Sequence, residues 1–137
     1  MELSFSWLAV VVATAVGMAI SGVWYGWAFV GVWRKLTGVT QEDSKRAGKT
    51  PFAFLLASIL VTALALAAGC AVTAGFFGSD PLWLDLAVGL ATWLGFSITT
   101  LVQHNAFEQK PGRLTMINSA YQLVLFLGMA LAIGLLQ

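Results

Sequence analysis

The amino-acid sequence predicts an all-α, polytopic membrane protein whose four transmembrane helices form two hairpins of the same orientation. Composition is the first observation behind this prediction. Of the 137 residues, 59% are hydrophobic and only 9% are charged, whereas about a quarter of the residues in a soluble domain are charged. The second observation is that the apolar residues form four runs. Each run reaches or exceeds the roughly 20 residues that a helix needs to cross a bilayer.

The four predicted helices belong to one domain, residues 1–137, and a cytoplasmic loop follows the first of them. Helices are favoured over strands because period-two alternation is absent and spans of this length in lipid are helical. The three prolines open the second, third and fourth runs, so we expect none of them to kink a span. The expected bounds are residues 4–33, 51–77, 81–108 and 113–136 for the helices and 34–50 for the loop.

Local signals predict where several helices begin. Thr40, followed by Glu42 and Asp43, is typical of the start of a short surface helix within the cytoplasmic loop. Thr50 is expected to cap the second long helix, and Asp80 to cap the third.

The distribution of basic residues predicts the orientation of the chain. Basic loops stay on the cytoplasmic side of a membrane, so we expect both termini on the outer side and a first helix that is retained rather than cleaved as a signal peptide. Glu2, Asp80 and Asp85 then lie on the opposite side. We interpret this charge division as a topology signal and expect no nucleic-acid partner. The seven basic residues are Arg34, Lys35, Lys45, Arg46 and Lys49 in one connection and Lys110 and Arg113 in another.

Small residues on two helices mark expected packing surfaces. Gly22 and Gly26 have the four-residue spacing that permits close approach of two helix backbones. Cys70, the single cysteine, is expected to be a buried thiol because it has no disulfide partner in the chain. In the second helix, small side chains recur every fourth residue and predict a seam for a neighbour: Ala63, Ala67, Ala71 and Gly75.

Aromatic residues gather near the cytoplasmic end of the first helix, where Trp24, Tyr25, Trp27 and Trp33 precede two basic residues. This order is typical of an interfacial aromatic belt followed by basic anchors. A cage for a cation or a lipid headgroup is the functional alternative. In contrast, Trp93 lies near the middle of its span, so its indole N–H is expected to find a partner inside the bundle or at a subunit contact.

Polar side chains concentrate on both sides of the turn between the third and fourth helices. Because these helices are antiparallel neighbours, we expect their polar faces to meet near the cytoplasmic surface. The faces could form a hydrogen-bonded clasp, or a vestibule in which His104 titrates or Glu108 binds a cation. The residues concerned are Thr100, Gln103, His104, Asn105 and Glu108 on the third helix and Asn118, Tyr121 and Gln122 on the fourth.

Motifs for catalysis and metal binding are absent from the sequence. The polar region around the turn between the third and fourth helices has one histidine and one glutamate, which are too few ligands for a metal site. No nucleophile elbow, phosphate-binding loop, CxxC pair or HExxH motif occurs in the sequence. We therefore expect no cofactor, no metal and no enzymatic activity.

Two blocks of the sequence resemble a known family. The first block is Gly22-Val23-Trp24-Tyr25-Gly26 with Phe29, Gly31 and Trp33. The second is Trp93-x-Gly95-Phe96 with Thr100, Asn105, Phe107, Glu108, Pro111, Leu114, Asn118 and Tyr121. The sequence departs from the family pattern at Gly26, where the family usually has Ser-Pro, and at Lys110, where it often has Arg. The pattern resembles that of small bacterial membrane proteins of domain-of-unknown-function family 1761. The resemblance implies four helices in a bacterial inner membrane and carries no activity.

Assembly is the function class that the sequence favours. Four helices with little loop mass cannot enclose a wide conduit alone, whereas small-residue stripes and bulky aromatics offer lateral contacts. We expect a homo-oligomer or a small subunit of a membrane complex. The alternatives are an oligomeric channel or transporter for a small solute or ion, lined by polar residues of the third and fourth helices, and an enzyme acting on a lipid.

Overall fold

The chain folds as a bundle of helices, and the computed structural model describes residues 6–137. Within these residues every regular element is helical. The elements are α1 (Trp7–Val23), a π-helical turn (Trp24–Ala28), α2 (Val30–Thr37), α3 (Gln41–Ala47), α4 (Thr50–Phe77), α5 (Leu82–Thr92), a second π-helical turn (Trp93–Ser97), α6 (Ile98–Phe107) and α7 (Gly112–Leu136). The predicted all-α class is confirmed.

Four continuous helices are long and apolar enough to cross a membrane. They comprise Trp7–Ala28, Thr50–Phe77, Leu82–Phe107 and Gly112–Leu136. The first and third each join an α-helix to a π-helical turn, and the third continues into α6. α2 follows the first span after a break at Phe29, whose φ of −121° and ψ of 12° are not helical.

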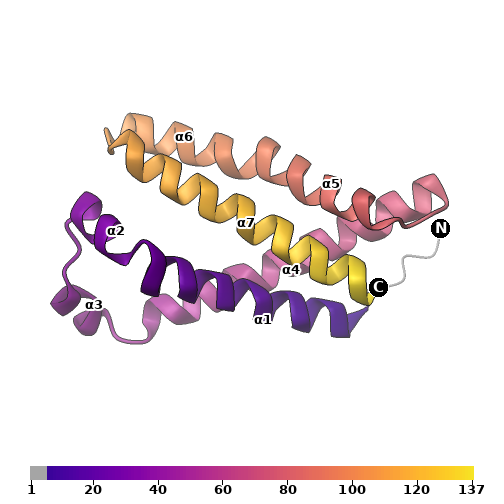
Figure 1. The fold of residues 1–137 in the computed structure, drawn as a ribbon, viewed down its shortest axis with the longest axis horizontal. Helices are drawn as coiled ribbons and strands as arrows, with labels where there is room; N and C mark the ends of the chain where they lie inside the picture. The colour runs from indigo at the N-terminus through magenta and orange to yellow at the C-terminus, as the bar shows by residue number, and fades with distance from the viewer. Residues whose placement is uncertain (1–5) are drawn as a thin grey trace.

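α7 is the centre of the bundle. In Figure 1 it lies between α1 on one side and the α5–α6 helix on the other, while α4 passes behind. The core is built where α1 and α4 meet α7, and Val10, Ile59, Met129 and Ile133 are among its most deeply buried side chains. Burial of such aliphatic side chains excludes both lipid and water from the α1–α4–α7 contact.

The two ends of the bundle differ in charge. We call the end formed by α2, α3 and the α6–α7 turn the basic end, because all seven Lys and Arg residues lie there. The opposite end, the terminal end, holds the turn between α4 and α5, and there the Ser6 hydroxyl lies 3.5 Å from the Leu136 carbonyl oxygen. Asp80 and Asp85 are the acidic residues at this end among residues 6–137.

Small residues permit close helix contacts at some of the expected positions and not at others. A Cβ added at Gly89 would lie 2.9 Å from the Ala130 Cβ, so α5 and α7 approach closely there. By contrast, a Cβ added at Gly22 or Gly26 would meet nothing within 4 Å. Within the bundle no neighbouring helix packs closely on these two exposed glycines, and their expected packing role stays a prediction for contacts outside it.

The small-residue seam of α4 is present over three of its four positions. Ala63, Ala67 and Ala71 are buried against neighbouring helices, whereas Gly75, one turn further on, is exposed. Cys70 is a free thiol with no solvent exposure, as its apolar surroundings in the sequence suggested.

Of the three predicted helix caps, one is confirmed and two are wrong. Thr40 precedes α3, accepts a hydrogen bond from the Asp43 N–H and completes a reciprocal capping box. Thr50 is the first helical residue of α4 rather than its cap. Asp80 does not cap α5, because Pro81 holds an extended ψ of 147° in the cap position and has no side-chain acceptor there.

Two π-helical turns interrupt the first and third spans at similar sequences. In each, the backbone N–H five residues on bonds to the carbonyl of a tryptophan, Trp24 or Trp93. Each turn reads Trp-x-Gly followed by an aromatic residue, Trp27 in the first and Phe96 in the second. The first and third spans thus share one local sequence pattern and one backbone irregularity.

Candidate functional site

Asn118 and Tyr121 of α7 bond to the first helix rather than to α6. The Tyr25 hydroxyl donates to Asn118 Oδ1 at 2.5 Å. One turn away, the hydroxyls of Ser21 and Tyr121 are also 2.5 Å apart. The rings of Tyr25 and Tyr121 meet edge to face, with centroids 4.8 Å apart. Four polar side chains from two helices thus form one connected cluster, which we call the tyrosine cluster.

A groove opens beside the tyrosine cluster at the basic end. Its volume is about 420 Å³, and the lining includes Tyr25 and Tyr121 from the cluster, Trp33 and Arg34 from α2, and Phe52 from α4. Gly22 and Gly26 form part of the same wall. The lack of side chains at these glycines leaves the groove open, which gives them a place in the structure other than helix packing.

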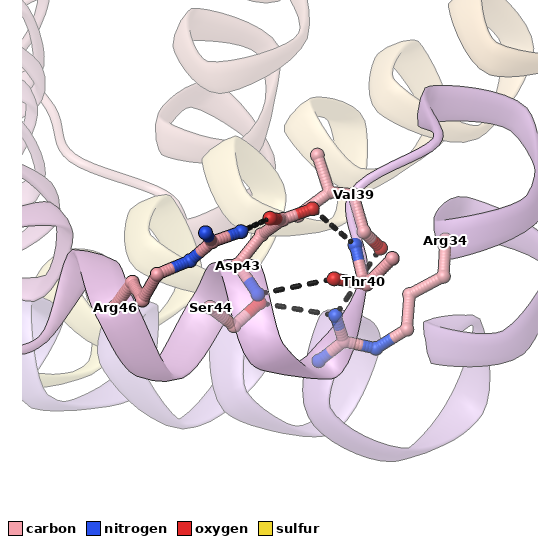
Figure 2. Close-up of polar contacts among 6 residues, drawn as sticks. All are labelled: Arg34, Val39, Thr40, Asp43, Ser44 and Arg46. Carbon is pink, nitrogen blue, oxygen red and sulfur yellow. Dashed lines mark hydrogen bonds and ion pairs between the residues drawn. The ribbon is translucent and has the colours of Figure 1, made fainter.

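Arg34 holds the short helix α3 against α2 at the mouth of this groove. Its Nη1 donates to the Val39 carbonyl oxygen at 3.3 Å and to the Ser44 hydroxyl at 3.0 Å. Figure 2 shows these contacts beside the capping box, in which Asp43 accepts from the Thr40 N–H and pairs with Arg46. Arg34 has no acidic partner within hydrogen-bonding distance among residues 6–137.

Two carboxylates at the basic end have pKa values below their usual range. For Asp43 the main cause is the hydrogen bond from the Thr40 backbone N–H, with smaller contributions from the Thr40 hydroxyl and Arg46. The hydrogen bond and charge of Lys110, 2.9 Å away, lower the pKa of Glu108. Both carboxylates therefore stay ionised at neutral pH, and each already has a cationic neighbour.

One direct polar link joins α6 to α7. The Asn105 side chain is buried and its Nδ2 donates to the Thr115 hydroxyl at 2.9 Å. Further along the third span, Trp93 Nε1 donates to the Ser119 carbonyl oxygen at 2.9 Å. The expected partner for the Trp93 indole inside the bundle is therefore present.

These two links set the rotation of the third span about its axis. Asn105 follows Trp93 by twelve residues, which in an uninterrupted α-helix would separate their faces by about 120°. The π-helical turn adds one residue, and discounting it leaves a difference of about 20°. Trp93 and Asn105 can therefore both face α7, because the π-helical turn lies between them.

The same rotation directs most of the predicted polar face of the third helix away from α7. Gln103, His104 and Glu108 are exposed, and Thr100 bonds to the Phe96 carbonyl of its own helix at 2.6 Å. The expectation that the polar faces of the third and fourth helices meet is thus wrong for Gln103, His104 and Glu108. Gln122 is half-buried and shares one shallow depression with Thr100, so only this pair and Asn105–Thr115 are brought together.

The aromatic residues of the first helix divide between the interior and the surface. Trp24 and Tyr25 are half-buried, and Trp24 packs at 4.5 Å from the Phe29 ring. Trp27 is 79% exposed, as an interfacial anchor would be, and Trp33 packs edge to face against Tyr25. The four residues therefore do not form one belt or one closed cage.

Trp24 carries a hydrogen-bond donor that the protein leaves without an acceptor. Its Nε1 is buried and no described residue accepts from it. Trp93, the corresponding residue of the second π-helical turn, bonds to a backbone carbonyl through the same atom. The two turns thus share a backbone geometry, but only the Trp93 indole N–H has a hydrogen-bond acceptor among the described residues.

Asp85 is the feature that sequence patterns give least reason to expect. Its side chain has no solvent exposure, and neither carboxylate oxygen has a hydrogen-bond donor within the described residues. Removing an unpaired charge from water costs several kcal/mol, whereas the nearby α5 N-terminus favours a carboxylate by only about 0.3–1 kcal/mol. Because Asp85 lies five residues after Asp80, in the first turn of the third span, it resembled another surface acid.

The tyrosine cluster had a partial signal in the sequence. Tyr25, Asn118 and Tyr121 all belong to the blocks that resemble the family, but periodicity alone could not pair α1 with α7. Ser21 was not among the predicted site residues. Gly134, which faces the Asp85 carboxylate from α7, carries no signal of its own.

Comparison with known proteins places the chain in a family. Neither a curated protein nor a solved structure matches it significantly. A family model described as "Protein of unknown function (DUF1761)" matches residues 8–134, which include all four long helices and both π-helical turns almost completely. The resemblance stated from the two sequence blocks is confirmed. The chain belongs to the DUF1761 family of proteins of unknown function.

Proposed function

We propose that the chain is a non-enzymatic membrane protein that works by assembly, and that it pairs with a second copy of itself through the outward face of α6. The observation that carries this proposal is the unequal packing of the four spans. Only 11% of the apolar window of Leu82–Phe107 is buried inside the bundle, against 28%, 28% and 39% for the other three. The third span is thus the one most available for a lateral partner.

The chemistry of the α6 surface supports a protein partner over lipid alone. Thr99 and Thr100 already bond to carbonyls of their own helix. Gln103 and His104 remain exposed, and Gln103 lines a shallow surface pocket with Ile98 and Val102. A two-fold axis beside α6 would bring each Gln103 close to its copy, where paired amides can hydrogen-bond across the interface.

The charge of the two ends supports one orientation for this assembly. With the basic end toward the cytoplasm, both termini face the outer side of a bacterial inner membrane. Reporter fusions at the C-terminus test this orientation. Alkaline phosphatase, which is active only outside the cytoplasm, should be active there, and green fluorescent protein should be dark. The reverse pattern would contradict the orientation without affecting the dimer.

Cysteine cross-linking tests the interface. In a Cys70→Ala background, Val102→Cys places a thiol on α6, and Leu56→Cys places one on α4 at the same 48% exposure. Oxidation in native membranes should give disulfide-linked dimers for Val102→Cys and only monomers for Leu56→Cys. Equal cross-linking at both positions, or none at either, would contradict pairing through α6.

A second measurement distinguishes assembly from transport. Native mass spectrometry of the wild type should give a dimer mass, and liposomes containing that dimer should show no solute or ion flux above empty liposomes. Flux that Gln103→Leu abolishes while the dimer persists would instead favour an oligomeric channel.

A further inference from the structure

The Asp85 carboxyl is enclosed by three elements at the terminal end of the bundle. The Cys70 thiol from α4 and the Asp80 carboxyl from the turn before α5 interact electrostatically with it, and neither makes a hydrogen bond of ordinary geometry to it. From α7 comes Gly134, where an added Cβ would lie 2.8 Å from Asp85 Oδ2. Among residues 6–137, these thiol and carboxyl groups are the titratable groups that face Asp85.

Among residues 6–137, no Lys or Arg lies near this carboxyl to balance a negative charge. All seven Lys and Arg residues are at the basic end, separated from Asp85 by the length of the bundle. Gly134 has no side chain, and the Asp85 carboxyl lies where a side chain there would begin, so α7 offers no side-chain donor at this position. A buried carboxyl with no donor and no counter-ion is most stable when it is neutral.

We propose that the buried carboxyl of Asp85 is a proton-binding site, and that its proton exchanges with water by way of the exposed carboxyl of Asp80. The proton comes from water at the terminal end, and its binding converts the Asp85 carboxylate into a carboxylic acid. A second carboxylate nearby makes a negative charge on Asp85 still less favourable. Asp80 is exposed, so it gives the proton a route between water and the buried group.

Proton binding at this site links acidity at the terminal end to helix packing. With the proton in place, Asp85 is a neutral group between α4, α5 and α7. Loss of the proton would put a negative charge among Cys70, Gly134 and the apolar residues around them. The contact of α5 with α4 and α7 should therefore loosen as pH rises.

Infrared spectroscopy of the full chain in liposomes tests the proposal directly. At neutral pH the wild type should show the C=O stretch of a protonated carboxyl, and this band should disappear reversibly as pH is raised. Asp85→Asn should lack the band. In Asp80→Asn the band should persist but shift in frequency, because the neighbouring carboxyl is replaced by an amide. Glu42→Gln, which alters an exposed acid at the basic end, should match the wild type.

Each outcome of this experiment supports or overturns the proton-binding site. A wild-type spectrum without the protonated band at neutral pH would overturn the proposal, whether or not the variants fold. A full-strength band in Asp85→Asn would also overturn it, since the proton would then belong to another group. Replacing sodium with a large organic cation should leave the spectrum unchanged, and a change would point to a metal cation in place of the proton.

Discussion

Tyr25 and Asn118, 93 residues apart in the sequence, share a 2.5 Å hydrogen bond that ties the first helix to the last. The bond forms between partly buried side chains, where few waters compete for either group. It also orients the Tyr25 ring against Tyr121, whose hydroxyl meets Ser21. The tyrosine cluster therefore joins the first helix to α7 by hydrogen bonds beside an otherwise apolar core.

The first prediction concerns this bond. Asn118→Leu should destabilise the fold by about 1 kcal/mol, because it removes the acceptor and leaves the Tyr25 hydroxyl unpaired. A double-mutant cycle with Tyr25→Phe should give a coupling energy of about 0.6–1.7 kcal/mol. Unfolding with sodium dodecyl sulfate in bicelles, followed by circular dichroism, measures both quantities. Gln122→Leu is the matched control and should be close to wild type; equal effects of the two leucine variants would contradict the assignment.

The second prediction separates the two amides of α6. Asn105→Leu should cost about 1–2 kcal/mol, because the buried link to Thr115 is lost. Gln103→Leu removes an exposed amide two residues away and should change the unfolding free energy of the monomer by less than about 0.5 kcal/mol. The same unfolding assay, at detergent dilutions that keep the chain monomeric, compares them. A larger loss for Gln103→Leu would show that α6 is rotated differently.

The third prediction compares two glycines. In Gly89→Ala the new Cβ would stand 2.9 Å from the Ala130 Cβ and 3.1 Å from the Phe126 carbonyl oxygen. Because one of these atoms is backbone, relief requires α5 and α7 to separate, at a cost of about 1–3 kcal/mol. Gly22→Ala meets nothing and should stabilise the helix by up to about 1 kcal/mol. Thermal unfolding midpoints compare the two variants. A destabilised Gly22→Ala would mean that another protein surface packs against this face of the first helix.

The fourth prediction concerns pH and α3. The folded-state pKa of Asp43 lies below its unfolded value, mainly because of the Thr40 N–H. Its stabilising contribution is therefore complete above the unfolded pKa of about 3.9 and is lost as pH falls through the folded value. The Thr40 amide resonance, followed by NMR, should move as α3 frays in acid. Asp43→Asn should remove this titration, whereas Glu42→Gln should leave it; persistence in Asp43→Asn would contradict the capping role.

Much of the fold was predictable because it depends on local properties. The length and hydropathy of four runs define the long helices, and residues such as Thr40 specify the start of α3 within one turn of chain. The approach of Trp93 to a bundle partner also follows from a local fact, namely that an indole N–H in an apolar span needs an acceptor.

The site was less predictable because it depends on rotation and on partners far away in the sequence. The face of α6 that meets α7 is decided by a π-helical turn, whose extra residue moves Asn105 inward and His104 outward. Helical periodicity assumes 3.6 residues per turn throughout and therefore places Gln103 and His104 on the wrong side of the helix. Asp85 was predicted to lie at the surface, because nothing near it in the sequence indicates that its side chain packs against Gly134.

The position of α7 has a consequence for how the protein is made. Among the four long helices it is the last to be synthesised, yet α1, α4 and α5 all pack against it. The earlier helices are therefore made before α7, against which they pack, and cannot complete their contacts until translation has passed Leu136. Ribosome stalling before Gly112 should leave three inserted helices that quality-control proteases recognise as incomplete.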